Sequence, residues 1–131
     1  MRVSLLATAV AAMMSAHCSD ATAPLPGPCD QSVLITVAGS VAPTVSWVPN
    51  CLVEQLIIEE QVPPSSGRFP IVWMIEARAP GQGAAAPVRY GDVPPSMREW
   101  IMAAPLVGGH RYVVRLTNTT GSLLGETSFT Y

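Results

Sequence analysis

The chain has 131 residues, and its seven Arg and nine acidic residues, with no Lys, give a formal net charge of −2. Hydrophobic residues make up 49% of the sequence and charged residues only 12%, and the 13 Pro and 10 Gly indicate one small domain with many turns. Because no cluster of basic side chains is present to neutralise a row of phosphates, this composition excludes a nucleic-acid-binding protein. The chain is also too weakly basic to coat an anionic membrane surface.

Residues 1–17 have the pattern of a secretory signal peptide. Met1-Arg2 supplies a positive charge, and the apolar stretch from Val3 to Ala16 ends in small residues. This stretch is shorter than the roughly 20 residues that a membrane-spanning helix needs. The pattern therefore predicts an exported protein.

The segment Ser15-Ala16-His17-Cys18 resembles the lipobox of bacterial lipoproteins, in which a dedicated signal peptidase cuts before a Cys that carries diacylglycerol on its sulfur. The resemblance implies a lipid on Cys18, a membrane bound through that lipid, and a location in the cell envelope. Two alternatives stay open. Cleavage after Ala16 would give a periplasmic or secreted chain without lipid, and an uncleaved segment would itself be the anchor.

Residues 18–28 are predicted to be a flexible, Pro-rich tether between the lipid and the domain. Pro and small polar residues dominate this segment. Such residues cannot form a hydrophobic core, and Pro keeps the backbone extended. The folded domain is therefore expected to span residues 29–131 and to stand off from the membrane.

The number of cysteines supports this arrangement. Three Cys are present, so a lipid on Cys18 would leave Cys29 and Cys51 to form a disulfide in an oxidising compartment. Closing a loop of about twenty residues contributes roughly 3 kcal/mol in the loop-entropy description. A metal site is the alternative, but His17 and His110 lie far from both Cys in sequence. We expect neither a metal nor a cofactor.

After residue 28 the sequence consists of short β-branched runs broken by Pro and Gly, which predicts an all-β sandwich or barrel. Strands are predicted over 31–38, 43–49, 52–62, 71–77, 110–118 and 123–131. Turns or loops are predicted at 39–40, 63–67, 90–95 and 119–122, with a flexible Gly/Ala-rich loop at 80–87. Alternation at period two predicts that Val45 and Trp47 share one face and that Tyr112, Val114 and Leu116 share another.

Residues 96–106 carry two conflicting signals. Ser96-Met97-Arg98-Glu99 matches a capping box, which would begin a short helix. Trp100, Met102, Ala104 and Leu106 instead fall on one face at period two, as in a strand. The all-β character of the surrounding sequence favours the strand.

Two motifs carry a resemblance to fibronectin type III and related immunoglobulin-like domains. Val45-Ser46-Trp47-Val48-Pro49 resembles the family's strand B, whose Trp fills the space between the two sheets. The segment 106–116 resembles its E–F corner and strand F. The resemblance covers roughly residues 31–131 and implies a single antiparallel β-sandwich. It also implies a core built around Trp47 and Leu106, and a tyrosine corner in which the Tyr112 hydroxyl bonds to the backbone.

The sequence shows no convincing nucleophile and base, carboxylate pair or metal cluster, so we do not expect an enzyme. His110 lies in a Gly-Gly-His-Arg context typical of a turn, which predicts a surface residue. Glu59, Glu60 and Glu76 would form an acidic patch for a cation if they met, but such residues are more often the solvated face of strands, and the sequence has no Asp-rich loop of the calcium-binding kind.

Three aromatic residues, Trp73, Tyr90 and Trp100, would line a glycan or peptide site if they were exposed together. The large area that Trp and Tyr usually bury favours core and loop packing instead.

Two functional hypotheses follow. The first is a non-catalytic, lipid-anchored envelope protein, similar to small bacterial envelope lipoproteins with one β-sandwich, that acts as a binding or structural module for an envelope protein or a glycan. Its loops or a sheet edge open to strand addition would make the contact. The second is a secreted small ligand-binding or hydrolytic domain that uses the loops around 63–100 and His110.

Overall fold

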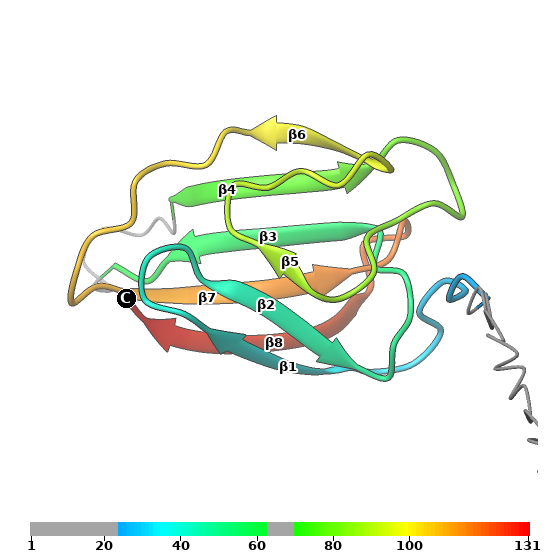
Figure 1. Ribbon diagram of the computed structural model, residues 1–131, viewed down its shortest axis with the longest axis horizontal. Coiled ribbons are helices and arrows are strands. Elements are labelled where there is room, and N and C mark those ends of the chain that lie inside the picture. Colours follow the sequence, from blue (N-terminus) through cyan, green and yellow to red (C-terminus); the bar gives the residue numbers. More distant parts are fainter. Residues whose placement is uncertain (1–23, 63–69) are drawn as a thin grey trace, which may run out of the picture.

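The computed structural model describes residues 24–62 and 70–131. Within these ranges the chain forms eight strands and no helix, arranged as two antiparallel sheets that pack against each other (Figure 1). The strands are β1 Leu34–Ala38, β2 Thr44–Val48, β3 Gln55–Glu60, β4 Ile71–Ala77, β5 Val88–Arg89, β6 Met97–Ile101, β7 Arg111–Thr117 and β8 Leu123–Thr130. The predicted all-β sandwich is therefore confirmed.

Some predictions concern other parts of the chain. The signal peptide at 1–17, the lipid-attachment Cys18 and the loop at 63–67 lie outside the described residues. The segments that are described contain no helix long and apolar enough to cross a membrane.

The smaller sheet has the strand order β1-β2-β5. In the β1–β2 register, Ile35 lies opposite Trp47, and both side chains are buried. Leu34 lies opposite Val48 on the other face, where both are exposed. Because successive residues of a strand point to opposite faces, the predicted alternation fixes which side of this sheet faces the core.

The larger sheet has the order β6-β4-β3-β7-β8. In its three central strands, β4, β3 and β7, the side chains that point toward the smaller sheet are buried. These buried residues are Leu56, Ile58, Trp73, Ile75, Tyr112, Val114 and Leu116. Burial of an aliphatic or aromatic side chain of this size contributes about 1.5–3 kcal/mol, so this layer supplies much of the hydrophobic stabilisation.

The two sheets meet along one side, where β1 lies beside β8. The Val33 amide donates a 2.9 Å hydrogen bond to the Leu124 carbonyl. Gly125 makes this approach possible, because a Cβ there would lie 2.6 Å from the Val33 carbonyl oxygen. The edges of β1 and β8 therefore shield each other.

A disulfide joins Cys29 to Cys51, as the number and spacing of the cysteines predicted. Two backbone hydrogen bonds flank it: Leu52 donates to Gly27 at 2.8 Å, and Cys29 donates to Leu52 at 2.9 Å. The end of the Pro-rich segment is thus fixed to the connection between β2 and β3. In Figure 1 this N-terminal segment lies at the opposite end of the sandwich from the C-terminus.

The prediction of a flexible loop at 80–87 is wrong in its centre. Ala84 is buried and exchanges backbone hydrogen bonds of 2.9 and 3.0 Å with Val53. Gly83 permits this contact, since a Cβ there would lie 2.5 Å from the Val53 carbonyl oxygen. The small residues that suggested flexibility instead allow the backbone to approach the core closely.

Residues 97–101 form strand β6, so the strand interpretation of this region is confirmed, but the core or loop packing expected for Trp100 is not found. Met97 is fully buried, whereas Trp100 is 57% exposed and Met102 79% exposed. The cause is the position of β6 at the edge of the sheet, with a β-bulge against β4. Trp100 is the unpaired residue of this bulge, between Glu99 opposite Ile75 and Ile101 opposite Met74, and Met102 lies beyond the end of the strand.

Candidate functional site

The three carboxylates considered for an acidic patch do not meet. Glu59 pairs with Arg115, Glu60 pairs with His110, and Glu76 pairs with Arg98 at 3.1 Å. Nowhere in residues 24–62 and 70–131 do three His, Cys, Asp or Glu side chains come together as a metal site.

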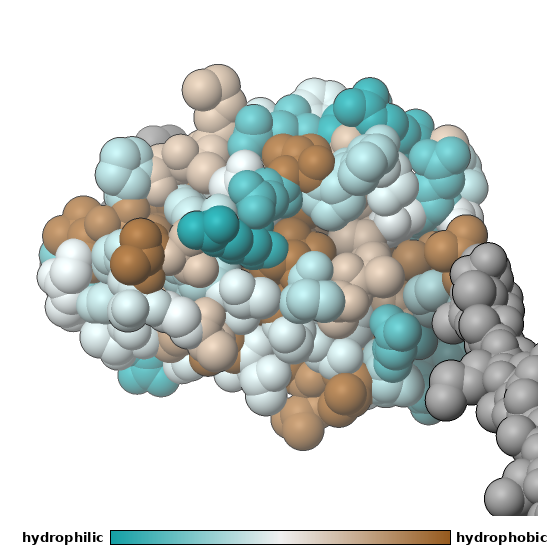
Figure 2. Space-filling model, viewed as in Figure 1, coloured by the Kyte–Doolittle hydropathy of each residue, from teal (hydrophilic) through white to brown (hydrophobic). Residues whose placement is uncertain are grey.

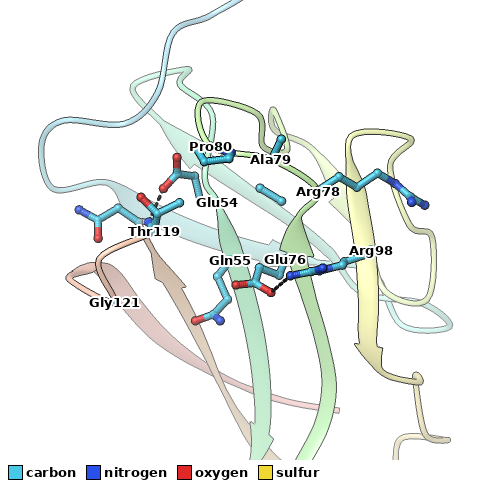
Figure 3. A pocket seen from close by; sticks show the side chains of 11 residues that line it. Glu54, Gln55, Glu76, Arg78, Ala79, Pro80, Arg98, Thr119 and Gly121 are labelled. Atoms are coloured by element: carbon cyan, nitrogen blue, oxygen red, sulfur yellow. Dashed lines mark hydrogen bonds and ion pairs between the residues drawn. The ribbon is translucent and has the colours of Figure 1, made fainter.

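A polar pocket of about 230 Å³ opens at the end of the larger sheet, near the β7–β8 turn (Figure 3). Glu54, directly before β3, is only 7% exposed beside it. One carboxylate oxygen accepts a hydrogen bond from the Gly81 amide at 3.4 Å, and the other accepts one from the Thr119 amide. This carboxylate therefore holds two connecting segments against the sheet.

Sequence reasoning missed Glu54. The only signal was a single acidic residue directly after Leu52-Val53, at the start of an apolar run. A carboxylate in such a run needs partners when it is buried, so this placement could have pointed to backbone donors from other segments.

The other polar groups of the pocket are also engaged. The Gln55 side-chain carbonyl accepts a 2.9 Å hydrogen bond from the Thr117 hydroxyl, and Glu76 accepts one from Arg98. Figure 3 shows Arg78 pointing away from Thr119, and its Nε donates to the Pro95 carbonyl at 3.1 Å. The pocket thus consists mainly of polar groups that stabilise the end of the sandwich.

A second hollow, of about 340 Å³, is lined by Glu60, Gln61, Val62, Gly109, His110 and Arg111. Here Nδ1 of His110 contacts a carboxylate oxygen of Glu60. The His110 side chain is about half exposed and follows the turn at Gly108-Gly109, as its sequence context predicted. A carboxylate next to an imidazole is an arrangement that orients the ring.

The three aromatic residues do not form one surface. Trp73 is fully buried, packs edge-on against Tyr90 with ring centroids 5.2 Å apart, and donates from Nε1 to Glu99 at 2.9 Å. The Tyr90 hydroxyl donates to the Ala104 carbonyl at 2.7 Å. Burial, together with the nearby Tyr112, raises the pKa of Tyr90 to about 12.

Trp100 alone of these three lies largely in solvent. Its Nε1 donates to the Glu76 carboxylate, and the Arg98 guanidinium lies 4.6 Å from its ring centroid. These contacts fix the orientation of the indole on the outer side of β6. An oriented, exposed Trp at a sheet edge is a surface suited to protein contacts.

The residues of the fibronectin-like motifs lie as follows. Trp47 is 2% exposed between the sheets, and Leu106 is partly buried against the core. Tyr112 is 1% exposed, and its hydroxyl accepts a 2.8 Å hydrogen bond from the Val107 amide.

Comparisons of the chain with protein-family models, curated proteins and solved structures found no match. The assignment of a β-sandwich is therefore based on the structure alone.

The surface in the view of Figure 2 carries its apolar residues in separate small patches between hydrophilic ones. Leu34, Val48, Val41 and Leu123 are exposed apolar residues outside β6. Scattered exposed apolar residues are normal for a folded domain.

Proposed function

We propose that this protein is an exported, non-catalytic β-sandwich of the bacterial cell envelope, anchored by a lipid on Cys18, that acts as a binding or structural module. The observation that carries the proposal is the disulfide between Cys29 and Cys51, placed directly after a Pro-rich segment. Disulfides persist in oxidising compartments, and a cross-link at the first residue of the domain resists unfolding from the tethered end.

The geometry of attachment supports the proposal. The N-terminal segment reaches the sandwich at one end, and the C-terminus lies at the other (Figure 1). The hollow beside His110 lies next to the C-terminal strand, since the Tyr131 amide donates to the His110 carbonyl at 3.0 Å. An anchored domain of this shape presents the end that carries the C-terminus away from the membrane.

Strand order supports the fibronectin-like or immunoglobulin-like character that the motifs imply. In immunoglobulin-like sandwiches, strands A, B and E share one sheet and strands C, F and G share the other. The order β1-β2-β5 corresponds to the first set, and the neighbours β3-β7-β8 correspond to the second. Strands β4 and β6 have no counterpart in these sets: β4 lies beside β3, and β6 adds an outer edge beside β4.

The intact mass of the protein from a membrane fraction tests the proposal. We expect a chain that begins at Cys18 and carries the added mass of diacylglycerol, and two thiols at Cys29 and Cys51 that react only after reduction. A Cys18→Ser variant serves as the control and should lose the added mass. A soluble chain without lipid would overturn the anchor.

A second candidate function, a small hydrolytic or ligand-binding domain, is favoured by the pair formed by His110 and Glu60 beside the second hollow. The carboxylate would orient His110 as a general base. Hydrolysis of p-nitrophenyl acetate by the full chain should then fall to background in a His110→Ala variant. Equal rates for both proteins would remove this candidate.

A further inference from the structure

The methionines within residues 70–131 differ widely in their exposure to solvent. Met97 is fully buried in the core, Met74 is partly buried, and Met102 is 79% exposed. Strand β6 ends at Ile101, so Met102 lies directly beyond the end of the strand. The thioether of Met102 is therefore open to small reagents in solution, whereas that of Met97 is enclosed by the core.

The backbone next to Met102 is held by hydrogen bonds that do not use the Met102 side chain. The Ala104 amide donates to the Val72 carbonyl at 2.9 Å. The Ala104 carbonyl accepts a 2.7 Å hydrogen bond from the Tyr90 hydroxyl. A chemical change at the sulfur of Met102 therefore leaves these contacts intact, and the segment after β6 keeps its path.

We propose that Met102 is a modification site, at which a peroxide converts the thioether to methionine sulfoxide while the fold is kept. With hydrogen peroxide, the sulfur attacks one oxygen, the O–O bond breaks and an S–O bond forms. The sulfur loses two electrons to the peroxide. The proton on the transferred oxygen passes to the departing hydroxide, which leaves as water. Methionine sulfoxide reductases reverse such an oxidation, so the modification is reversible.

Burial gives the same reaction opposite consequences at Met102 and Met97. The sulfoxide oxygen of Met102 stays in water, where it is solvated. At Met97 it would lie among the apolar side chains of the core, where a polar group without a partner is unfavourable. Oxidation of Met102 therefore makes the exposed segment that also carries Trp100 more polar without a change in the core. The inference does not depend on the lipid anchor.

Peptide mass spectrometry of the full chain after treatment with hydrogen peroxide tests the proposal. Trypsin cleaves after Arg78, Arg89, Arg98 and Arg111, which places the three methionines on different peptides. The peptide of Met102 should gain the mass of one oxygen atom first. The peptide of Met97 should react about 100-fold more slowly, because its sulfur is reached only when the domain opens. In concentrated urea the difference between the two peptides should disappear.

Two matched variants assign the reaction to one side chain. Met102→Leu should remove the fast reaction from residues 70–131. Met97→Leu, a substitution that conserves volume in the core, should keep it. After oxidation of Met102 alone, the urea midpoint should equal that of the untreated chain.

Three results would overturn the proposal. The first is oxidation of Met74 or Met97 in the folded chain as fast as that of Met102. The second is a fast reaction within residues 70–131 that persists in Met102→Leu. The third is a lower urea midpoint once Met102 alone is oxidised.

Discussion

Nε1 of Trp47 donates a 2.9 Å hydrogen bond to the carbonyl oxygen of Cys51. Trp47 is 2% exposed between the two sheets, and Cys51 forms the disulfide that fixes the N-terminal segment. One short connection after β2 therefore joins the inter-sheet core to the point where the N-terminal segment meets the domain.

Removal of the disulfide should lower the free energy of unfolding. For a double variant with Cys29→Ser and Cys51→Ser we expect a loss of about 2–4 kcal/mol, because the unfolded chain regains the freedom of the closed loop. Urea unfolding followed by Trp fluorescence measures this change. The native chain with a reducing agent should shift to the same midpoint, and equal midpoints with and without the disulfide would contradict the expectation.

Glu54 should matter for stability far more than an exposed Glu. Replacing it with Gln removes one of two acceptor oxygens, places a side-chain NH₂ against the backbone N–H of Gly81 or Thr119, and should cost about 1–3 kcal/mol. Glu126→Gln is the matched control, since Glu126 is 45% exposed and pairs with Arg115 at the surface. We expect less than about 1 kcal/mol there. Similar urea midpoints for the two variants would show that Glu54 does not hold the loops.

The strands of the core could be predicted from the sequence because local rules decide them. Val45 and Trp47 alternate with the polar Thr44 and Ser46, and Tyr112, Val114 and Leu116 recur at period two, so the pattern gives each strand and its core-facing residues, although Val113 is also buried. The disulfide could be predicted because a chain expected to be exported, with three cysteines of which Cys18 lies in the expected lipobox, leaves Cys29 and Cys51 to pair.

The remaining features depend on contacts between distant segments. Glu54 bonds to amides 27 and 65 residues away, and no local pattern encodes those partners. Core or loop packing was expected for Trp100, but the sequence does not show that β6 lies at the edge of its sheet. Pairing order decides exposure there, and pairing order is a tertiary property.

Alkaline pH should destabilise the protein through Tyr90. Its pKa is raised to about 12 from 10.0, so between these values the folded chain holds a proton that the unfolded chain releases. The contribution of this group is therefore fully present below pH 10 and is lost as pH rises toward 12. Urea midpoints measured between pH 9 and pH 11.5 should fall.

Tyr90→Phe is the variant that isolates this effect. It should be less stable at pH 9, because the hydrogen bond to the Ala104 carbonyl is lost, and its midpoint should fall less between pH 9 and pH 11.5. An equally steep decline in both proteins would assign the alkaline loss to other groups.

Substitution of Gly125 should separate the two sheets along the side where β1 lies beside β8. A Cβ at this position would lie 2.6 Å from the Val33 carbonyl oxygen and 3.0 Å from Val33 Cγ2, so Gly125→Ala must push β8 away from the segment before β1. We expect a loss of about 1–3 kcal/mol, the usual cost of overpacking. Gly108→Ala is the control because a Cβ there meets nothing within 4 Å, and it should change stability by less than about 0.5 kcal/mol. Hydrogen exchange of the Val33 amide should accelerate in Gly125→Ala and not in Gly108→Ala. Unchanged exchange in both variants would mean that the contact between β8 and the segment before β1 does not depend on the close approach at Gly125.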